Sequence, residues 1–316
     1  VVHDEPEGGE RLEQKSYSSG HQPTRPAERR SNFAYLKQLK MEILNYTFFQ
    51  NALIGSLLAS IVCGFIGTYI VTRRLVFISG GITHASFGGI GLGVFFGINP
   101  ILSALIFAVF SACGVQWMSH RNDVREDSAI AVFWTFGMSI GIICSFLTPG
   151  FMPDLPSFLF GSILTIGTAD IILLAALSVV VILIFTILFR PILSVAFDAC
   201  FARSQHLPVT AIEYLMMVLI AMTIVSTLRM VGIVLAISLL TIPQMTANLF
   251  TFSFKRMIAY SILFGWIDCL IGLMISYWMN IPSGASIIFV SIIVFALFKT
   301  IIMLFNKFAK SEIATS

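Results

Sequence analysis

Residues 171–189 read IILLAALSVVVILIFTILF, nineteen consecutive positions without a charged side chain. A helix needs about 20 such residues to cross a hydrocarbon core of about 30 Å. Comparable apolar runs without β-barrel alternation recur after residue 48, near 49–72, 76–97, 100–118, 128–147, 168–189, 211–228, 230–250, 257–279 and 284–305. The sequence therefore predicts an all-α polytopic membrane protein with eight or nine transmembrane helices in a lipid bilayer.

The composition of the 316-residue chain agrees with a lipid environment. Hydrophobic residues make up 57% of it and charged residues 11%, with a mean hydropathy of +0.91. A soluble domain carries about 25% charged residues, so a soluble enzyme is excluded. The net charge of +3 comes from 19 basic and 16 acidic residues, too few and too balanced for a nucleic-acid partner. The five cysteines occur singly, which indicates neither disulfides nor a zinc knuckle.

Residues 1–40 differ in composition from the rest of the chain. They hold 7 of the 19 basic and 6 of the 16 acidic residues, and they lack the apolar segment of a signal peptide. We expect a disordered tail or an extension foreign to the natural protein, with a regulatory tail as the alternative. The transmembrane domain should then cover 41–310, and 311–316 should form a cytoplasmic C-terminal tail.

Basic residues mark every second boundary between the predicted spans. They are Arg73, Arg74, Arg121, Arg125, Arg190, Arg203, Lys255, Arg256, Lys307 and Lys310. The boundaries at 97–100, 147–157 and 280–283 carry none. The positive-inside rule assigns the basic boundaries to the cytoplasm. Nine spans then place the start of the first helix outside and the C-terminus inside, although Lys37 and Lys40 disagree with that orientation.

A polar, glycine-rich segment interrupts the second span. Residues 78–89 read ISGGITHASFGG and contain His84, with Thr83 and Ser86 close to it. Ionisable groups inside a bilayer are costly and usually line a pathway, and imidazole is a common metal ligand. We therefore interpret His84 as a metal-binding residue and Thr83 and Ser86 as pathway residues. The alternative is a packing face of small residues with a hydrogen-bonded histidine.

Proline and polar residues interrupt two later parts of the chain. Thr241, Pro243 and Gln244 lie in the seventh run, where the proline removes a backbone donor and leaves the region of the Leu239 carbonyl open. Ser283 follows a turn on the outer side, before the last span. These residues are candidates for a pathway or gate, while a packing kink and a plain connecting turn explain the same sequences.

Asp268 is an acidic residue near the centre of the eighth span. A carboxylate at that depth costs about 2.5–3.5 kcal/mol on insertion scales, so it should face the bundle interior or be protonated. It could meet His84 in a metal or proton pathway. A buried, hydrogen-bonded aspartate that serves assembly is the alternative.

The connection 190–209 is the longest on the cytoplasmic side, and it contains a short helical stretch too brief and too polar to cross a membrane. Such a helix is an interfacial anchor or a docking element for a soluble partner. The chain has no Gly-x-x-x-x-Gly-Lys-Ser/Thr phosphate loop, catalytic triad or acid/base carboxylate pair. Nucleotide-driven work would therefore need another subunit.

An ordered set of motifs makes the sequence similar to permease subunits of ABC importers for zinc, manganese or iron. The motifs are Arg73-Arg74, 80–86, 97–100, 159–162, 197–209, 239–247 and 281–285. The resemblance covers about residues 45–305 and extends more distantly to permeases for cobalamin and iron chelates. It implies a type II ABC importer bundle in a bacterial cytoplasmic (inner) membrane. It also implies a permease homodimer, ATPase subunits that bind the ATP, and an extracytoplasmic metal-binding protein.

The resemblance also assigns roles to single residues. The loop 198–209 matches the family's coupling helix, and the candidate ATPase-coupling residues are Phe197, Asp198, Ala202, Arg203, Leu207 and Pro208. Family members typically have an aspartate four residues before the motif histidine and another just before the Pro-Ser/Ala-Gly turn. These positions are Gly80 and Asn280 here, so only His84 is retained. Asp268 and Asn280 are the further candidate metal ligands.

We expect a transport subunit that is not an enzyme, has no cofactor of its own, and carries a divalent metal ion. One imidazole with few charges suits zinc or ferrous ion better than manganese, so zinc is placed slightly ahead of manganese and iron. The alternatives are a permease for a metal chelate, a proton-coupled secondary transporter that uses Asp268 and His84, and a membrane assembly protein. A secondary transporter would work without an ATPase and would leave the docking loop unexplained.

Overall fold

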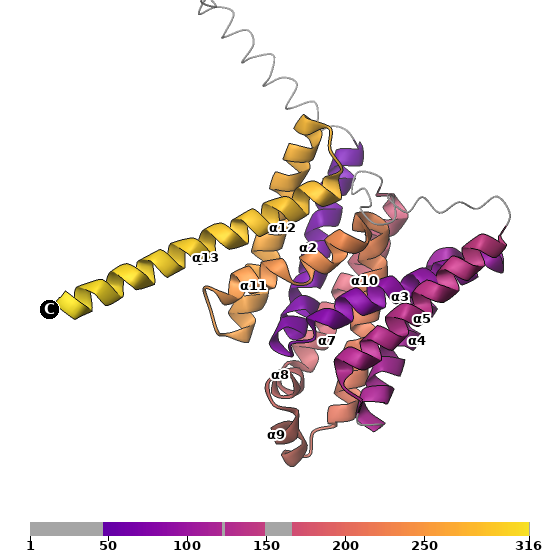
Figure 1. Ribbon diagram of the computed structural model, residues 1–316, viewed down its shortest axis with the longest axis horizontal. Helices are drawn as coiled ribbons and strands as arrows, with labels where there is room; N and C mark the ends of the chain where they lie inside the picture. The colour runs from indigo at the N-terminus through magenta and orange to yellow at the C-terminus, as the bar shows by residue number, and fades with distance from the viewer. Residues whose placement is uncertain (1–46, 122–123, 149–165, 316) are drawn as a thin grey trace, which may run out of the picture. The chain divides into compact units, whose positions relative to one another are not determined.

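The computed structural model describes residues 47–121, 124–148 and 166–315 (Figure 1). These residues form the helices α2 (Thr47–Thr72), α3 (Val76–Phe95), α4 (Pro100–Arg121), α5 (Glu126–Leu147), α7 (Thr168–Ile187), α8 (Phe189–Phe197), α9 (Ala199–Ser204), α10 (Val209–Leu239), α11 (Ile242–Asn248), α12 (Phe254–Met279) and α13 (Ser283–Thr315). The predictions for 1–40 and for the motif at 159–162 lie outside the described residues.

Eight helical segments of the described chain are long and apolar enough to cross a membrane, which confirms the predicted all-helical membrane fold. They lie in α2, α4, α5, α7, the two halves of the α10–α11 region, α12 and α13. Helix α3 has the length of a span, at 20 residues, but is not among the eight. Glycine, serine, threonine and histidine replace much of the apolar content that a span normally carries.

The sixth and seventh predicted runs, 211–228 and 230–250, correspond to the separate candidate spans Val209–Leu228 and Val231–Asn248. Helix α10 holds the sixth run and the start of the seventh, and a kink at Gly232 divides them, since its φ of 76° and ψ of 174° are non-helical. A positive φ costs glycine little because it has no Cβ. The helix ends at Leu239, and α11 begins at Ile242 with Pro243 in its first turn, where no backbone N–H is needed. Proline therefore starts a new helix here, whereas the sequence predicted a kink within one helix.

The glycines of α3 bring three helices into close contact, and Figure 1 shows α3, α4 and α5 side by side. A Cβ on Gly88 would lie 2.5 Å from the carbonyl oxygen of Gly137 in α5. A Cβ on Gly89 would lie 2.6 Å from Ala104 Cα in α4. Small residues that let backbones touch are a common means of packing helices in lipid. The alternative interpretation of segment 78–89 as a packing face therefore holds for these glycines.

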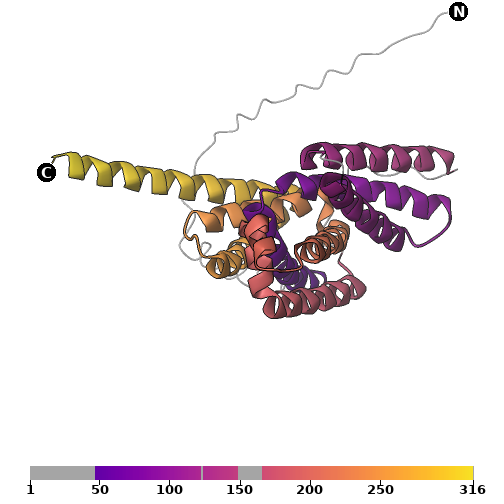
Figure 2. The ribbon, with the colours of Figure 1, turned by 90° about the horizontal axis from the view of Figure 1, so that it is seen from below.

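Helices α2 and α10 form the centre of the bundle. Helix α2 packs against α7 and α12, and α10 contacts α2, α3, α4 and α13. Figure 2 shows the same helices from below, with α13 as the long yellow helix. Ile66 and Tyr69 of α2 and Met216 and Ile220 of α10 are among the largest fully buried side chains. This core joins the α3–α5 group to the α11–α13 group.

Candidate functional site

His84 lies near the middle of α3 and is half-buried. Its imidazole stacks on the indole of Trp134 from α5, with ring centroids 4.6 Å apart and ring planes 3° apart. Stacking fixes the plane of the imidazole and leaves both nitrogens at the ring edge. Within the described chain neither nitrogen has a hydrogen-bond partner. Trp134 was not identified from the sequence, because only the packing of α3 on α5 brings it to His84.

Gly80 lies one helical turn before His84 and on the same side of α3. A Cβ at this position would meet Ile237 Cδ1 at 3.8 Å, an ordinary van der Waals contact. A Cβ on the neighbouring Gly81 would instead lie 2.2 Å from Ile130 Cγ2. Packing therefore requires glycine at position 81 but leaves room for a side chain at position 80.

Thr83 and Ser86, the predicted pathway residues next to His84, are fully buried. The Thr83 hydroxyl donates to the carbonyl of Ser79, and the Ser86 hydroxyl donates to the carbonyl of Thr83. Both bonds stay within α3, which is how such hydroxyls are commonly satisfied inside a helix. The two side chains therefore contribute to the small-residue face of α3, and their place on a pathway stays a prediction.

Asp268 of α12 is 1% exposed. Ser291 of α13 lies beside its carboxyl group, yet Asp268 Oδ1 and Ser291 Oγ lack hydrogen-bond partners among the described residues. No hydrogen bond or ion pair joins Asp268 to His84 in the described chain. The same residues contain no group of three or more His, Cys, Asp or Glu side chains that could hold a metal ion. Asp268 and His84 thus belong to different helix groups, and a metal at His84 would need ligands from elsewhere.

Gln244 fills the gap that Pro243 opens. Its Nε2 donates to the carbonyl of Leu239, four residues before the proline, at 3.0 Å, and to the carbonyl of Cys63 on α2 at 2.8 Å. Gly67 of α2 permits this approach, because a Cβ there would lie 2.6 Å from Gln244 Nε2. The carbonyl that the sequence predicted to be open is therefore occupied by the protein. The contact ties α2 to the break between α10 and α11.

The other predicted gate residues, Thr241 and Ser283, and the candidate ligand Asn280 lie at helix ends. The Thr241 hydroxyl donates to the carbonyl of Ile237 at 2.8 Å, next to the α10–α11 break. Asn280 is exposed and ends α12 at φ 52° and ψ 42°, a left-handed conformation that asparagine tolerates well. Ser283 is buried at the start of α13. Each residue thus has a structural role at a helix end, and a further role as ligand or gate stays a prediction.

The predicted coupling segment forms two short helices, α8 and α9, which Figure 1 shows at one end of the described bundle. Asp198 caps α9, because its Oδ1 accepts hydrogen bonds from the backbone N–H groups of Cys200 and Phe201, each at 2.9 Å. Ala202 is fully buried, and Leu207 packs on the core. These three predicted coupling residues therefore hold the segment in shape.

The outer side of this segment carries exposed side chains. Phe197 is 64% exposed and Phe201 57% exposed, and Arg203 is exposed on the last turn of α9. Pro208 precedes α10 as its N-cap residue. Phe201 was not among the predicted coupling residues, although its aromatic side chain in a short cytoplasmic helix was an available signal. Exposed aromatic groups on a short rigid helix are suited to binding a protein partner.

A partly buried ion pair, also missed from the sequence, links this segment to the bundle. Arg73 at the end of α2 places Nη2 2.8 Å from Oε1 of Glu213 in α10. Gln116 Nε2 of α4 donates to the other carboxylate oxygen at 3.0 Å. Arg73 Nη1 donates to the carbonyl of Val195 in α8 at 3.2 Å. Four helices therefore meet at Arg73 and Glu213, which are far apart in sequence and carry no local signal for pairing.

Comparison with known proteins identifies the family. The model of the ABC 3 transport family matches residues 45–303. An uncharacterized membrane protein of Synechocystis is 39% identical over 255 residues, which cover 81% of this chain and 91% of that protein. The manganese transport system membrane protein MntC of Halalkalibacterium halodurans is 33% identical over 256 residues, which cover 81% of this chain and 88% of that protein.

A solved structure agrees with the sequence relatives. The structure of PsaBC from Streptococcus pneumoniae in complex with Fab is similar at a TM-score of 0.74 and 28% identity, over 83% of this chain and 95% of that chain. The family match spans most of the helical bundle described above. This chain therefore belongs to the ABC 3 transport family and is the multi-pass membrane permease of a bacterial ABC importer, a transport protein rather than an enzyme.

Proposed function

We propose that this permease passes a divalent first-row metal ion across the membrane by way of His84. The observation that carries the proposal is an imidazole within the bundle whose ring is held by Trp134 and whose nitrogens have no partner among the described residues. Relatives of the chain are named for manganese transport, such as the MntC protein reported above. A single imidazole forms a weak site, which suits an ion in transit because a tight site would retain it.

Two lines of support bear on the identity of the cargo, and they point to different metals. Imidazole is a good ligand for zinc, whereas manganese favours carboxylate and other oxygen ligands. Gly80 supplies no ligand beside His84, so the donor set supports zinc. The names of several relatives, at about one third identity, support manganese. We therefore retain zinc as the first candidate from the residues and manganese as its direct competitor in the test.

The proposed machinery contains further subunits. Two permease copies form the pathway, an extracytoplasmic binding protein delivers the metal, and an ATPase subunit docks under each copy. The exposed Phe197, Phe201 and Arg203 around α9 support an ATPase contact at this segment. The Arg73 contact to Val195 supports transmission of movement from α8 into α2 and α10. Asp268 and Asn280 remain secondary ligand candidates on this proposal.

The test is uptake of isotopic zinc, manganese and iron by cells that coexpress the chain with its ATPase and binding protein. His84→Ala should reduce uptake of the true cargo at least tenfold while the complex still assembles. His120→Ala is the matched control, because His120 is exposed at the end of α4. Asp268→Asn tests whether the buried carboxyl takes part.

The outcomes separate the proposal from its alternatives. Unchanged uptake in His84→Ala would remove His84 from the pathway. Metal uptake that persists without the ATPase would indicate a proton-coupled transporter. An assembled wild-type complex that hydrolyses ATP but takes up none of the three metals would indicate a chelate as cargo.

A further inference from the structure

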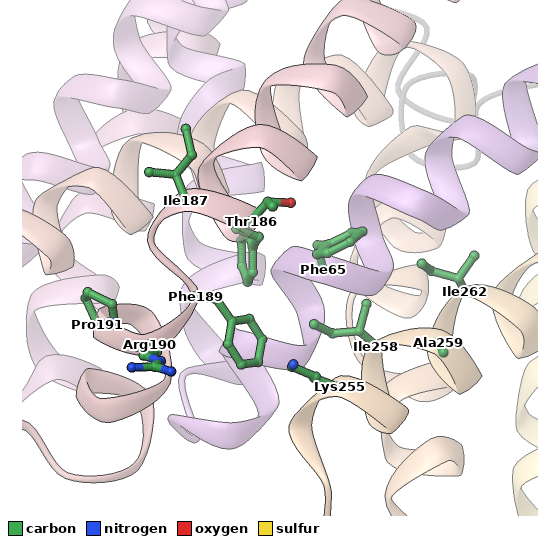
Figure 3. A pocket seen from close by; sticks show the side chains of 11 residues that line it. Phe65, Thr186, Ile187, Phe189, Arg190, Pro191, Lys255, Ile258, Ala259 and Ile262 are labelled. Carbon is green, nitrogen blue, oxygen red and sulfur yellow. The ribbon is translucent and has the colours of Figure 1, made fainter.

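A cavity of about 680 Å³ lies between α2, α7, α8 and α12, away from His84 (Figure 3). Its wall is formed by Phe65 of α2, Phe185 of α7 and Ile258 and Ile262 of α12. Phe65 and Phe185 meet edge to face with ring centroids 5.3 Å apart, so this wall is a packed apolar surface. A cavity of this size can hold a small organic ligand.

Two basic side chains lie at one end of the same cavity. Arg190 and Lys255 both line it, and Figure 3 shows them on either side of Phe189. Lys255 Nζ lies 4.9 Å from the centroid of the Phe189 ring. Both basic side chains are exposed, and neither forms an ion pair within the described residues. The cavity therefore combines an apolar wall with uncompensated positive charge.

The position of the cavity matches the surface of a membrane. Helix α7 ends at Ile187, and α12 begins at Phe254, so Arg190 and Lys255 lie where these spans leave the lipid. Ile262 lies eight residues into α12, which corresponds to a depth of about 12 Å at 1.5 Å per residue. The apolar wall thus extends from the charged end into the hydrocarbon region. Basic residues at these boundaries assign this end to the cytoplasmic leaflet.

We propose that this cavity binds one anionic phospholipid of the cytoplasmic leaflet. The phosphate contacts Arg190 and Lys255 at the rim, and an acyl chain lies along Phe65, Phe185 and Ile262. A soluble anion would leave the apolar wall uncovered, and a lipid without net charge would leave the two cations without a counter-charge. Basic pockets between transmembrane helices on the cytoplasmic side are suited to acidic headgroups.

The bound lipid contacts α8, the helix that leads into α9. Phe189 belongs to α8, and its ring packs on Phe254 of α12 with centroids 6.1 Å apart. Phe197, at the other end of α8, packs on the same Phe254 ring at 6.4 Å. A lipid against Phe189 and Lys255 therefore touches both partners of this aromatic contact and should help to fix α8 on α12.

The test measures lipid binding to the purified, delipidated full-length protein by native mass spectrometry. The probes are phosphatidylglycerol, phosphatidylcholine and the soluble headgroup glycerol 1-phosphate. Wild type should bind one phosphatidylglycerol in preference to phosphatidylcholine by on the order of tenfold. The double variant Arg190→Ala/Lys255→Ala should bind the two lipids equally. Arg256→Ala is the matched control, because Arg256 is the exposed basic residue next to Lys255 but does not line the cavity.

A second variant tests the apolar wall while both cations remain. Ala259→Trp fills the cavity from an exposed position of α12 and should abolish the specific phosphatidylglycerol adduct. Equal binding of the two lipids by wild type would overturn the proposal. If Arg256→Ala lost the preference to the same extent as the double variant, general surface charge would explain the binding and the proposal would fail. If glycerol 1-phosphate bound as tightly as phosphatidylglycerol, the cavity would be a site for free phosphate and the proposal would fail too.

Discussion

At position 80 a glycine leaves the side of α3 above His84 without a charged ligand, although the space for one exists. A Cβ there meets Ile237 Cδ1 at 3.8 Å, so Gly80→Asp should fold and place a carboxylate one turn from the imidazole. Manganese prefers oxygen ligands, so Gly80→Asp should raise manganese uptake relative to zinc several-fold. Competitive uptake of the two isotopes measures this ratio.

Gly80→Asn is the control for Gly80→Asp, because it has the same size without the charge. An unchanged metal ratio in both variants would mean that residue 80 does not face the transported ion. Gly81→Asp should fail to fold, since its Cβ would lie 2.2 Å from Ile130 Cγ2. The contrast between neighbouring glycines therefore separates a ligand effect from a packing effect.

Single residues show how far the sequence could identify the site. His84 could be found because an ionisable group within an apolar run is costly and therefore rare. Trp134 and Ser291 could not be found, because each lies on another helix and reaches its partner only through tertiary packing. The amide of Gln244 was recognised as polar, but its bond to the Cys63 carbonyl depends on how close α2 approaches.

At the scale of the helices, the joint between α2 and the α10–α11 break depends on Gly67. A Cβ on Gly67 would lie 2.5 Å from the Leu240 carbonyl oxygen and 2.6 Å from Gln244 Nε2. Gly67→Ala should therefore lower the melting temperature of the purified protein, despite the better helix propensity of alanine, by breaking bonds worth about 1–2 kcal/mol. Gly80→Ala is the matched control and should be neutral or stabilising. Equal melting temperatures for the two variants would show that α2 and the α10–α11 break can adjust to a side chain at position 67.

The ion pair between α2 and α10 should contribute to the stability of the bundle as a unit. Glu213 is buried and accepts from Arg73 and Gln116, so Glu213→Gln leaves the Arg73 charge without its partner. A double-mutant cycle with Arg73→Gln should give a coupling free energy of about 1–3 kcal/mol in chemical unfolding. Arg74→Gln, at the neighbouring exposed arginine, should give none with Glu213→Gln. Additive effects of Arg73→Gln and Glu213→Gln would contradict the pairing.

The helices were predictable from the sequence where they span the bilayer. An apolar run of about 20 residues has few alternatives in lipid, so the spans followed from the sequence. The break at Gly232 falls close to the predicted boundary between the runs 211–228 and 230–250, whereas the new helix at Ile242 was predicted only as a kink at Pro243. The division of α8 from α9 at Asp198 is local, since an aspartate that caps a following helix is a recognisable signal.

For the whole molecule, the basic ends of the spans and the α8–α9 segment lie on one side of the bundle. The basic boundaries predicted this side from the sequence alone, since Arg190, Arg203 and Lys255 flank the ends of spans. The structure adds that Phe197 and Phe201 are exposed there while Ala202 is buried. A surface that is aromatic and next to the Arg73 contact with Val195 should bind a partner and transmit its movement to the spans.

Phe201→Ala should therefore reduce copurification of the ATPase with the permease at least tenfold, without changing the melting temperature of the permease alone. An exposed aromatic anchor is commonly worth about 2 kcal/mol or more at an interface, and Phe201 makes no contribution to the buried core. Phe252→Ala is the matched control, since Phe252 is 94% exposed in the loop before α12. Asp198→Ala should weaken copurification less, by loosening the cap of α9, whereas Asp198→Asn keeps an acceptor oxygen and should behave like wild type. Normal ATPase recovery with Phe201→Ala would remove Phe201, the one large exposed apolar side chain of α9, from the docking surface.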